Sequence, residues 1–155
     1  RGEIDKINEL VYSHFNNGVY RAGFARSQEA YDEAVKKVFV CLDQMEKWLS
    51  ARRYLAGDRI TEVDWRAFPT LLRFDPVYHG HFKCNLRRVQ DYPSLANYLR
   101  ELYQWPGIKE TFDLQQTKAG YYSQQIVNPT GIVPLGPDMS HLELPHDRGR
   151  LAAAV

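Results

Sequence analysis

The sequence predicts an all-α fold, a bundle of helices around one hydrophobic core. Three observations support this prediction. Apolar residues recur at steps of three and four along several stretches, capping residues mark helix starts, and no stretch keeps the apolar–polar alternation of a strand. The chain has 155 residues, of which 44% are hydrophobic and 25% charged, so it is long enough for one domain with a substantial core.

The N-terminal part predicts two helices. Over residues 4–15 the apolar side chains share one helical face. We expect this helix to break at residues 16–18, because the Asn-Asn-Gly sequence there tolerates left-handed backbone conformations. A longer helix is expected over residues 28–50, with Ser27 as its N-cap. Its apolar face consists of Tyr31, Ala34, Val35, Val38, Phe39, Leu42, Met45 and Leu49.

The start of the third helix is marked by a capping box. Thr61 can accept a hydrogen bond from the backbone of Asp64, and the Asp64 carboxylate can accept one from the backbone of Thr61. Ile60 and Trp65 stand at the positions of a hydrophobic staple. Pro69 conflicts with a regular helix, so we expect a kink just before it.

Further helices are expected in the second half. Residues 74–85 are rich in aromatic side chains and interrupted by Pro76 and Gly80, which predicts turns or short helical pieces. A helix should begin at Pro93 and end before residues 106–107, and its inward face consists of Leu95, Tyr98, Leu99 and Leu102. A short helix from Ile108 should lead to a last one over residues 117–125.

The sequence from Asn128 onward is rich in Pro and Gly and predicts an extended tail. Within it, Ile132, Val133 and Leu135 are apolar but share no helix face. We therefore expect residues 128–137 to pack back over the bundle, since burial of such side chains contributes roughly 1.5–3 kcal/mol each. After Asp138 the chain should be looser.

Composition excludes some classes of function. With 20 basic and 19 acidic residues, the chain shows no charge excess typical of proteins that bind nucleic acid or anionic membranes. No apolar run approaches the roughly 18 residues that a membrane span needs. Only two cysteines are present, without a CxxC motif, which favours a reducing compartment, so we expect the protein to be cytoplasmic.

Few residues suggest catalysis or metal binding. Cys41 lies beside a predicted core face and is interpreted as a small buried hydrophobe. Cys84 follows Lys83, which could lower its pKa, but a structural or merely exposed thiol is the better interpretation. His79 and His81 lack a further ligand at zinc-site spacing, so no metal is expected.

Two tyrosine-containing segments suggest a binding site. Ten tyrosines stand in this chain, and a tyrosine offers a flat ligand both an apolar face and a hydroxyl. Residues 16–24 combine glycines and amides with Tyr20 and Arg21, and residues 119–122 place Tyr121 and Tyr122 on different faces of a helix. On the residues alone, turn formation and packing explain both segments equally well.

Several segments resemble the Xi-class glutathione transferases, which are the glutathionyl-hydroquinone reductases. The resemblance covers nearly all of residues 4–137 in the same order. It is carried by NNGVYRAGFARSQEAYDEAV (16–35), RYLAGDRITEVDWRAF (53–68), LLRFDPVYHGHFKCNLRR (71–88), DYPSLANYLRELYQWPG (91–107) and NPTGIVPLGP (128–137).

The resemblance implies a two-domain enzyme that uses glutathione as a co-substrate. An N-terminal thioredoxin-like domain would bind glutathione and hold a catalytic cysteine in a Cys-Pro motif. This chain would be the transferase-like C-terminal helical domain, over residues 1–137, followed by a tail over residues 138–155. It would line the site for an aromatic quinol thioether and contain no catalytic residue itself. A homodimer is expected.

The resemblance also implies substrate-binding residues. Tyr20 and one of Tyr121 and Tyr122 would point their hydroxyls at the quinol oxygens, and Tyr121 is preferred. We expect the hydroxyls of Tyr20 and Tyr121 to converge on one aromatic-lined pocket, from opposite sides of a flat cavity, where they can bind the para oxygens of a hydroquinone. Arg21 would orient the pair, although a surface salt bridge would explain it equally well.

The sequence departs from the family at four places. Gly120 replaces a histidine, residues 124–125 are Gln-Gln instead of Ser-His, Pro69 replaces a helix former or threonine, and the Cys-Pro motif is missing. The first three bear on where the second tyrosine lies, and the missing Cys-Pro motif leaves open whether the chain is itself an enzyme. One alternative is a free-standing helical domain that acts as a protein-interaction module, and another is a transferase for a different electrophile.

Overall fold

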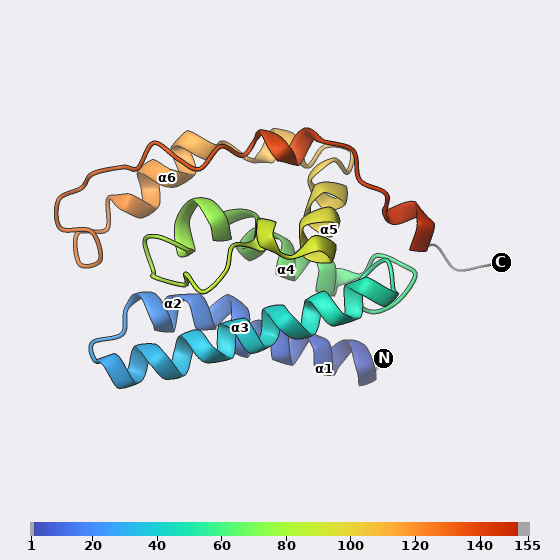
Figure 1. The fold of residues 1–155 in the computed structure, drawn as a ribbon, viewed down its shortest axis with the longest axis horizontal. Helices are drawn as coiled ribbons and strands as arrows, with labels where there is room; N and C mark the ends of the chain where they lie inside the picture. The colour runs from blue at the N-terminus through green and yellow to red at the C-terminus, as the bar shows by residue number, and fades with distance from the viewer. Residues whose placement is uncertain (1, 152–155) are drawn as a thin grey trace.

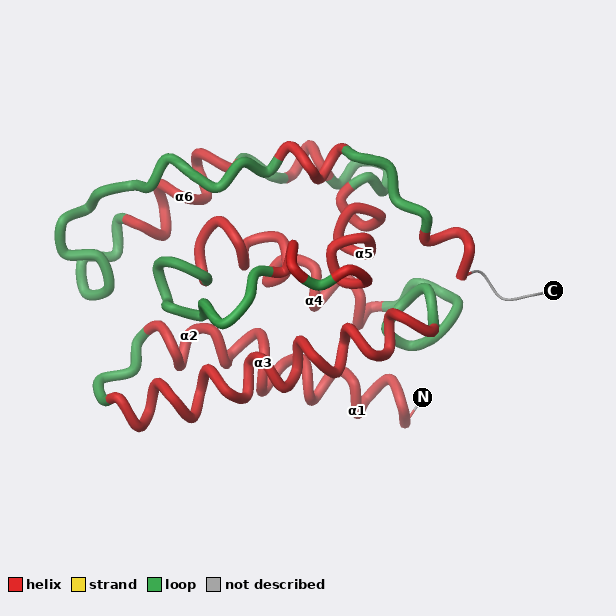
Figure 2. Tube along the Cα trace, viewed as in Figure 1, coloured by secondary structure: helices red, strands yellow, loops and turns green. Residues whose placement is uncertain are grey.

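The computed structural model describes residues 2–151 and confirms an all-α fold. Six α-helices are joined there by short 3-10 and π-helical turns and by loops. Figure 2 shows the described chain as helical segments linked by loops. Over residues 2–151 no strand forms, and the only β-type pairing there is an isolated bridge between Tyr54 and Gly57. No helix in that range is long and apolar enough to cross a membrane.

The N-terminal helix continues through the place where we expected a break. Helix α1 (Gly2–Leu10) passes into a π-helical turn, η1 (Val11–Asn16), and then into α2 (Asn17–Gly23). Asn16 and Asn17 both have right-handed helical backbone angles, so the predicted break is wrong. A Cβ on Gly18 would lie 2.9 Å from Cγ2 of Val38. Gly18 therefore allows close packing of two helices instead of ending one.

Helix α3 (Gln28–Ala51) lies alongside α1 and α2 in Figure 1 and confirms the second predicted helix. The hydroxyl of Ser27 accepts a hydrogen bond from the backbone of Ala30 at 3.1 Å, as the N-cap prediction requires. The predicted apolar face is buried except at Tyr31, which is half-buried. Cys41 joins the same face.

Helix α4 (Glu62–Arg73) begins where predicted, with Thr61 and Asp64 placed as a capping box that a hydrogen bond closes on the Asp64 side. The backbone N–H of Thr61 donates to the Asp64 carboxylate at 2.8 Å. The Thr61 hydroxyl has no hydrogen-bond partner among residues 2–151, and the backbone N–H of Asp64 donates to the carbonyl of Thr61 at 3.1 Å instead. The carboxylate therefore supplies the cap. The helix continues across Pro69 to Arg73.

The second half contains two further α-helices and several short turns. A π-helical turn, η2 (Phe74–Tyr78), follows α4 directly. Helix α5 (Pro93–Tyr103) starts at its proline, as predicted, and its four expected inward residues are buried. Helix α6 (Leu114–Tyr122) starts three residues earlier than expected, because Asp113 caps it by accepting from the backbone of Gln116 at 3.0 Å. Short 3-10 turns are η3 (Val89–Asp91) and η4 (Lys109–Thr111).

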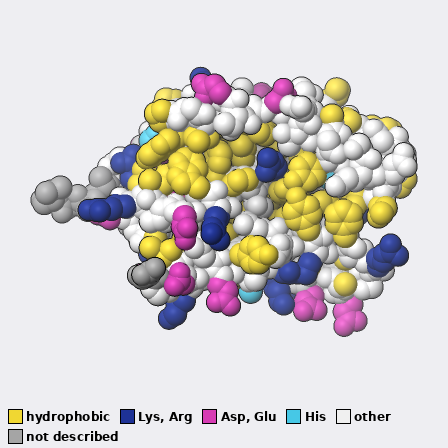
Figure 3. All heavy atoms as spheres, turned by 180° about the vertical axis from the view of Figure 1, so that it is seen from behind, with side chains coloured by type: hydrophobic (Ala, Val, Ile, Leu, Met, Phe, Trp, Pro, Cys, Tyr) yellow, Lys and Arg dark blue, Asp and Glu magenta, His cyan; other side chains and the backbone are white. Residues whose placement is uncertain are grey.

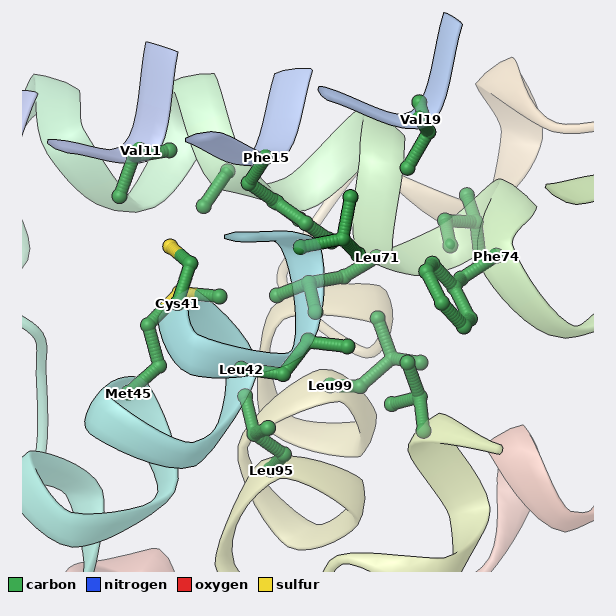
Figure 4. Close-up of a cluster of buried hydrophobic side chains, with 14 of the residues drawn as sticks. Val11, Phe15, Val19, Cys41, Leu42, Met45, Leu71, Phe74, Leu95 and Leu99 are labelled. Carbon is green, nitrogen blue, oxygen red and sulfur yellow. The ribbon is translucent and has the colours of Figure 1, made fainter. Parts of the chain in front are cut away.

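The core lies where η1, α2 and α3 meet α4, η2 and α5. Figure 4 shows side chains from each of them in one cluster, including Val11, Phe15, Val19, Leu42, Leu71, Phe74 and Leu99. All of these side chains are buried. Such a continuous apolar cluster fixes the positions of α2 and η2 relative to each other. Helix α6 is positioned by its contacts with η2.

The tail differs from both of its predictions. Ile132, Val133 and Leu135 are 69%, 40% and 99% exposed, so the predicted burial of these side chains is wrong. This segment is held by its backbone instead: the buried ammonium of Lys118 donates to the carbonyl of Leu135 at 3.0 Å and to that of Gly136 at 2.9 Å. Hydrogen bonds from a buried cation therefore hold this segment to the bundle, where apolar packing was expected to hold it.

Residues after Asp138 are docked, whereas we expected them to be loose. They form the 3-10 turns η5 (Ser140–Glu143) and η6 (Arg148–Leu151). Met139, Leu142 and Arg148 are buried, and the first two join the core cluster. The tail is therefore anchored by the apolar Met139 and Leu142 and by the charged Arg148. The sequence did not predict the anchor at Arg148. Residues 152–155 lie outside the described part.

Candidate functional site

Three tyrosine hydroxyls meet at one point. Tyr20 of α2 and Tyr121 of α6 have their hydroxyl oxygens 2.7 Å apart, and that of Tyr78 in η2 lies 2.8 Å from Tyr121. The oxygens of Tyr20 and Tyr78 are 3.4 Å apart. We call these three residues the tyrosine triad. Each hydroxyl can donate one proton and accept at two lone pairs, so the triad can redirect its protons toward an incoming oxygen.

An aromatic wall supports the triad. The ring of Phe82 stacks on Tyr78 with 5.3 Å between centroids and meets the ring of Tyr20 edge-on at 5.3 Å. Phe24 meets Phe82 edge-on at 5.5 Å. A Cβ on Gly23 would clash with the Phe82 ring, so the glycine at the end of α2 is what lets this ring reach Tyr20. Aromatic pairs in these arrangements contribute more than their buried area alone.

Two π-helical turns set the positions of the tyrosines. Each inserts extra chain into a helix and so changes which face the following residues occupy; such turns occur often at functional sites. The first, η1, precedes Tyr20 and is tied to α4 through Asn16, which accepts from the hydroxyl of Thr70 at 3.0 Å. The second, η2, contains Tyr78. The guanidinium of Arg21 donates to the carbonyl of Ser13 within η1.

Two open cavities flank Tyr20. One, of about 450 Å³, lies between the triad and α6 and is lined by Tyr20, Arg73, Gln116, Thr117, Gly120, Tyr121 and Gln124. We call it the triad cavity. The other, of about 570 Å³, lies between α2 and α3 and includes Tyr20, Arg21, Phe24 and Lys37. Figure 3 shows hydrophobic side chains gathered on the rear face, including the side where α2 and α6 lie.

The hydroxyls of Tyr78 and Tyr121 keep their protons at neutral pH. Burial raises the pKa of Tyr78, and its hydrogen bonds to the other two tyrosines raise it further. Burial also raises the pKa of Tyr121, while the charge of Arg73 acts in the opposite direction. The triad is therefore a set of hydrogen-bond donors in a partly dry environment, suited to hold an oxygen that carries negative charge.

The structure brings Tyr20 and Tyr121 together but not Tyr122. Tyr122 is 8% exposed, and its ring packs against His81 with 4.5 Å between centroids. A Cβ on Gly80 would lie 3.4 Å from its hydroxyl, so Tyr122 faces the 79–84 loop instead of the triad cavity. Arg21 forms no ion pair among residues 2–151 and contacts the η1 backbone instead of the hydroxyl pair.

The hydroxyls of Tyr20 and Tyr121 converge on one cavity, as expected, but the expectation that they lie at opposite sides of it is wrong. Their oxygens are within hydrogen-bond distance, whereas the two oxygens of a hydroquinone lie across a six-membered ring from each other. The pair can therefore hold one ligand oxygen, not both. Tyr78 was missed as a site residue. Its signal was its position in the aromatic stretch between Pro76 and Gly80, which predicted turns but not their direction.

The thiols play no part in the site. Cys41 and Cys84 are both buried and unpaired with each other. Burial raises the pKa of each thiol to about 12, so neither forms a reactive thiolate at neutral pH, and Lys83 does not offset this effect at Cys84. Within the part of the chain that the structure describes, no three His, Cys, Asp or Glu side chains group as metal ligands.

Comparison with known proteins gives consistent matches along the chain. The family model described as glutathione S-transferase, C-terminal domain, matches residues 28–101. Glutathionyl-hydroquinone reductase PcpF of Sphingobium chlorophenolicum is 56% identical over 138 residues, which are 88% of this chain and 44% of that protein. Glutathionyl-hydroquinone reductase YqjG of Escherichia coli is 50% identical over 147 residues, 94% of this chain and 44% of that protein.

Solved structures agree with these matches. The glutathione-bound structure of YqjG, a glutathione transferase homologue from Escherichia coli, has a TM-score of 0.93 at 49% identity and covers 96% of this chain. The Xi-class transferase from Natrialba magadii has a TM-score of 0.93 at 48% identity and covers 97%. This chain covers 48% and 46% of those two structures. It therefore spans about half the length of the relatives that it matches.

Proposed function

Because the chain belongs with the helical C-terminal domains of the Xi-class glutathione transferases, we propose that it forms the acceptor site of a glutathione-dependent reductase. The substrate of that reductase is a glutathionyl-hydroquinone, an aromatic quinol thioether, and the product is the hydroquinone. Two of the relatives carry this activity in their names.

The tyrosine triad is the observation that supports this proposal most. Three phenol hydroxyls within 2.7, 2.8 and 3.4 Å of one another come from three separate elements and border an open cavity. Packing alone does not require three hydroxyls to converge. Together they can donate to one phenolic oxygen of the substrate, while the neighbouring aromatic rings contact its ring.

The reaction needs a thiolate that this chain does not supply. A thiolate attacks the thioether sulfur, the carbon–sulfur bond breaks, the ring carbon takes up a proton and a mixed disulfide forms; a second glutathione then releases oxidised glutathione. We assign the thiolate to a cysteine in an N-terminal thioredoxin-like domain, which would also bind most of the glutathione. The role of the triad is to hold the quinol oxygen and stabilise negative charge that develops on it.

A role as a protein-interaction module is the second candidate. Ile126, Ile132 and Leu135 are exposed on the segment after α6, and three such side chains on one segment favour contact with another protein surface. This observation is also compatible with the first proposal, since a thioredoxin-like domain would need a surface to pack against. We further propose a homodimer in the cytoplasm, for which the two buried, unbridged cysteines support the reducing compartment.

Hydroquinone binding to this chain tests the proposal. Isothermal titration under anaerobic conditions should detect binding to the unmodified chain. Tyr20→Phe and Tyr121→Phe should each weaken it by about tenfold, the equivalent of one lost hydrogen bond of ~1.4 kcal/mol. Tyr12→Phe is the matched control, because Tyr12 is exposed and lies away from the triad cavity. Equal binding by all four proteins would overturn the proposal.

A further inference from the structure

The triad cavity contains an arginine without a partner. Arg73 is the last residue of α4 and immediately precedes η2, the turn that carries Tyr78. It lines the cavity together with Tyr20 and Tyr121, and none of the residues that line this cavity is acidic. Among residues 2–151, no carboxylate lies within 4.0 Å of its guanidinium, which makes no hydrogen bond to a protein atom there.

Most other arginines of this chain are compensated. Six of them lie within 4.0 Å of a carboxylate oxygen, even where both side chains are largely exposed: Arg52, Arg53, Arg66, Arg87, Arg88 and Arg150. Arg148 is buried and donates to three backbone carbonyls. Arg73 is half-buried beside the triad and has neither kind of partner. An unpaired cation in a partly dry cavity favours an anionic ligand.

The triad complements that charge. Its hydroxyls can all act as donors, and a phenolate oxygen accepts hydrogen bonds without bringing a proton of its own. A neutral phenol would add a fourth hydroxyl proton to three that already bond one another. The protein therefore offers a phenolate both the donors and the compensating charge.

We propose that Arg73 makes the triad cavity selective for the phenolate form of its ligand, and so for acidic phenols and hydroquinones with electron-withdrawing ring substituents. Arg73 is in this view a specificity-determining residue. The inference rests on the proposed function and deepens it, because it names the ionisation state and the electronic class of the ring that binds.

The groups near the cavity whose pKa values are shifted titrate further from neutral pH than usual, so they do not mask the titration of the ligand. The pKa values of Tyr78 and Tyr121 are raised, mainly by burial. His81 contacts Gln124 of the cavity lining at 3.3 Å. Burial lowers the pKa of His81, so its imidazole is neutral at neutral pH. Tyr20 faces the cavity from α2, and apart from Arg73 the remaining lining residues are uncharged. Arg21 is engaged with η1 on the other side of Tyr20.

Optical titration with 4-nitrophenol tests the inference. Its pKa lies near neutrality, and its anion absorbs visible light while the neutral form does not. Bound to the unmodified chain, the phenol should ionise about one pH unit lower than in solution, which corresponds to about tenfold tighter binding of the phenolate. Arg73→Gln should abolish this preference, and Arg73→Lys should retain part of it. Arg66→Gln, on the same helix, is the control and should change nothing.

The outcomes separate the two proposals. Equal binding of phenol and phenolate by the unmodified chain would overturn the role of Arg73, and so would a preference that survives in Arg73→Gln. Either result leaves the proposed function standing if Tyr121→Phe still weakens binding. No binding of either form would overturn both. If Arg73→Gln does not fold, Arg73→Lys decides, because an undiminished preference in that variant would overturn the role of Arg73.

Discussion

The guanidinium of Arg148 donates to the carbonyl of Leu49 at 2.9 Å, across 99 residues of chain. Leu49 lies in the last turn of α3, where backbone carbonyls lack helical partners. The same guanidinium donates to the carbonyls of Arg52 and Arg53 at 2.9 and 2.7 Å and lies over the ring of Tyr98. A residue of the tail thus caps the longest helix of the described chain, and the tail is part of the fold.

Replacing Arg148 should destabilise the fold. Arg148→Met keeps the aliphatic part of the side chain but removes three charged hydrogen bonds, so the free energy of unfolding should fall by at least ~1.5–3 kcal/mol. Urea unfolding followed by circular dichroism measures this change. The control is Arg150→Met, which removes an exposed ion pair with Asp147 and should have little effect. Equal stability of the two variants would show that the tail does not support α3.

The Thr61–Asp64 capping box predicts unequal effects of its two residues. Asp64 accepts from the backbone of Thr61 and Leu55 and from the hydroxyl of Tyr98, whereas the Thr61 hydroxyl has no partner in the described residues. Asp64→Ala should therefore cost more than ~3 kcal/mol, and Thr61→Ala no more than ~0.5 kcal/mol, the low end for an N-cap. Thermal unfolding of both variants measures the difference. A larger loss for Thr61→Ala would indicate that its hydroxyl caps the helix in solution.

Gly18 should be intolerant of alanine because of Val38. The strain of the added Cβ, ~1–3 kcal/mol, should exceed the ~0.8–1 kcal/mol that alanine gains over glycine in a helix. Gly18→Ala should therefore lower stability, and Val38→Ala should cost less in its presence than alone. Gly120→Ala is the matched control, since no atom lies within 4 Å of its Cβ and stability should rise. Stabilisation by Gly18→Ala would mean that the two helices are not in close contact.

The two thiols should be unreactive in the folded chain. Because burial raises the pKa of both to about 12, the thiolate fraction stays low at neutral pH. A thiol reagent should label neither cysteine in the native chain and both after unfolding. The chain alone should likewise show no turnover of a quinol thioether with glutathione. Turnover that is lost on replacing Cys84 with alanine would contradict the assignment of the thiolate to another domain.

Tyr121 and Tyr122 should differ in what their hydroxyls do. Tyr121→Phe removes a triad hydroxyl and should weaken phenol binding while leaving folding nearly intact, since its ring still packs. Tyr122→Phe should leave binding unchanged, because its ring lies against His81. Ligand titration combined with thermal unfolding separates the two effects. In the reductase that contains this domain, Tyr121→Phe should reduce transition-state stabilisation by about 1–3 kcal/mol.

The sequence by itself determined the helices and most of the core. Periodicity located α3 and α5 with their inward faces, and the N-cap Ser27 and the first-turn Pro93 marked their starts. These features depend on neighbours within one or two turns, so local chemistry is sufficient. The sequence was also sufficient for the family resemblance and for the interpretation of Cys41 and Cys84 as unreactive thiols.

Only the tertiary structure decided where the tyrosines point and how the tail is held. Tyr20, Tyr78 and Tyr121 come from three elements. The residues near the two π-helical turns predicted a break and turns there, but not the direction in which the tyrosines point. Gly18 was interpreted as a break because its reason, the approach of Val38, lies on another helix. Arg148 and Lys118 bind backbone carbonyls of residues that are distant in the sequence. Because every residue has a backbone carbonyl, the sequence does not show which ones they bind. Contacts of this kind have no sequence signature, because the partner is defined by its position in space and not by its side chain.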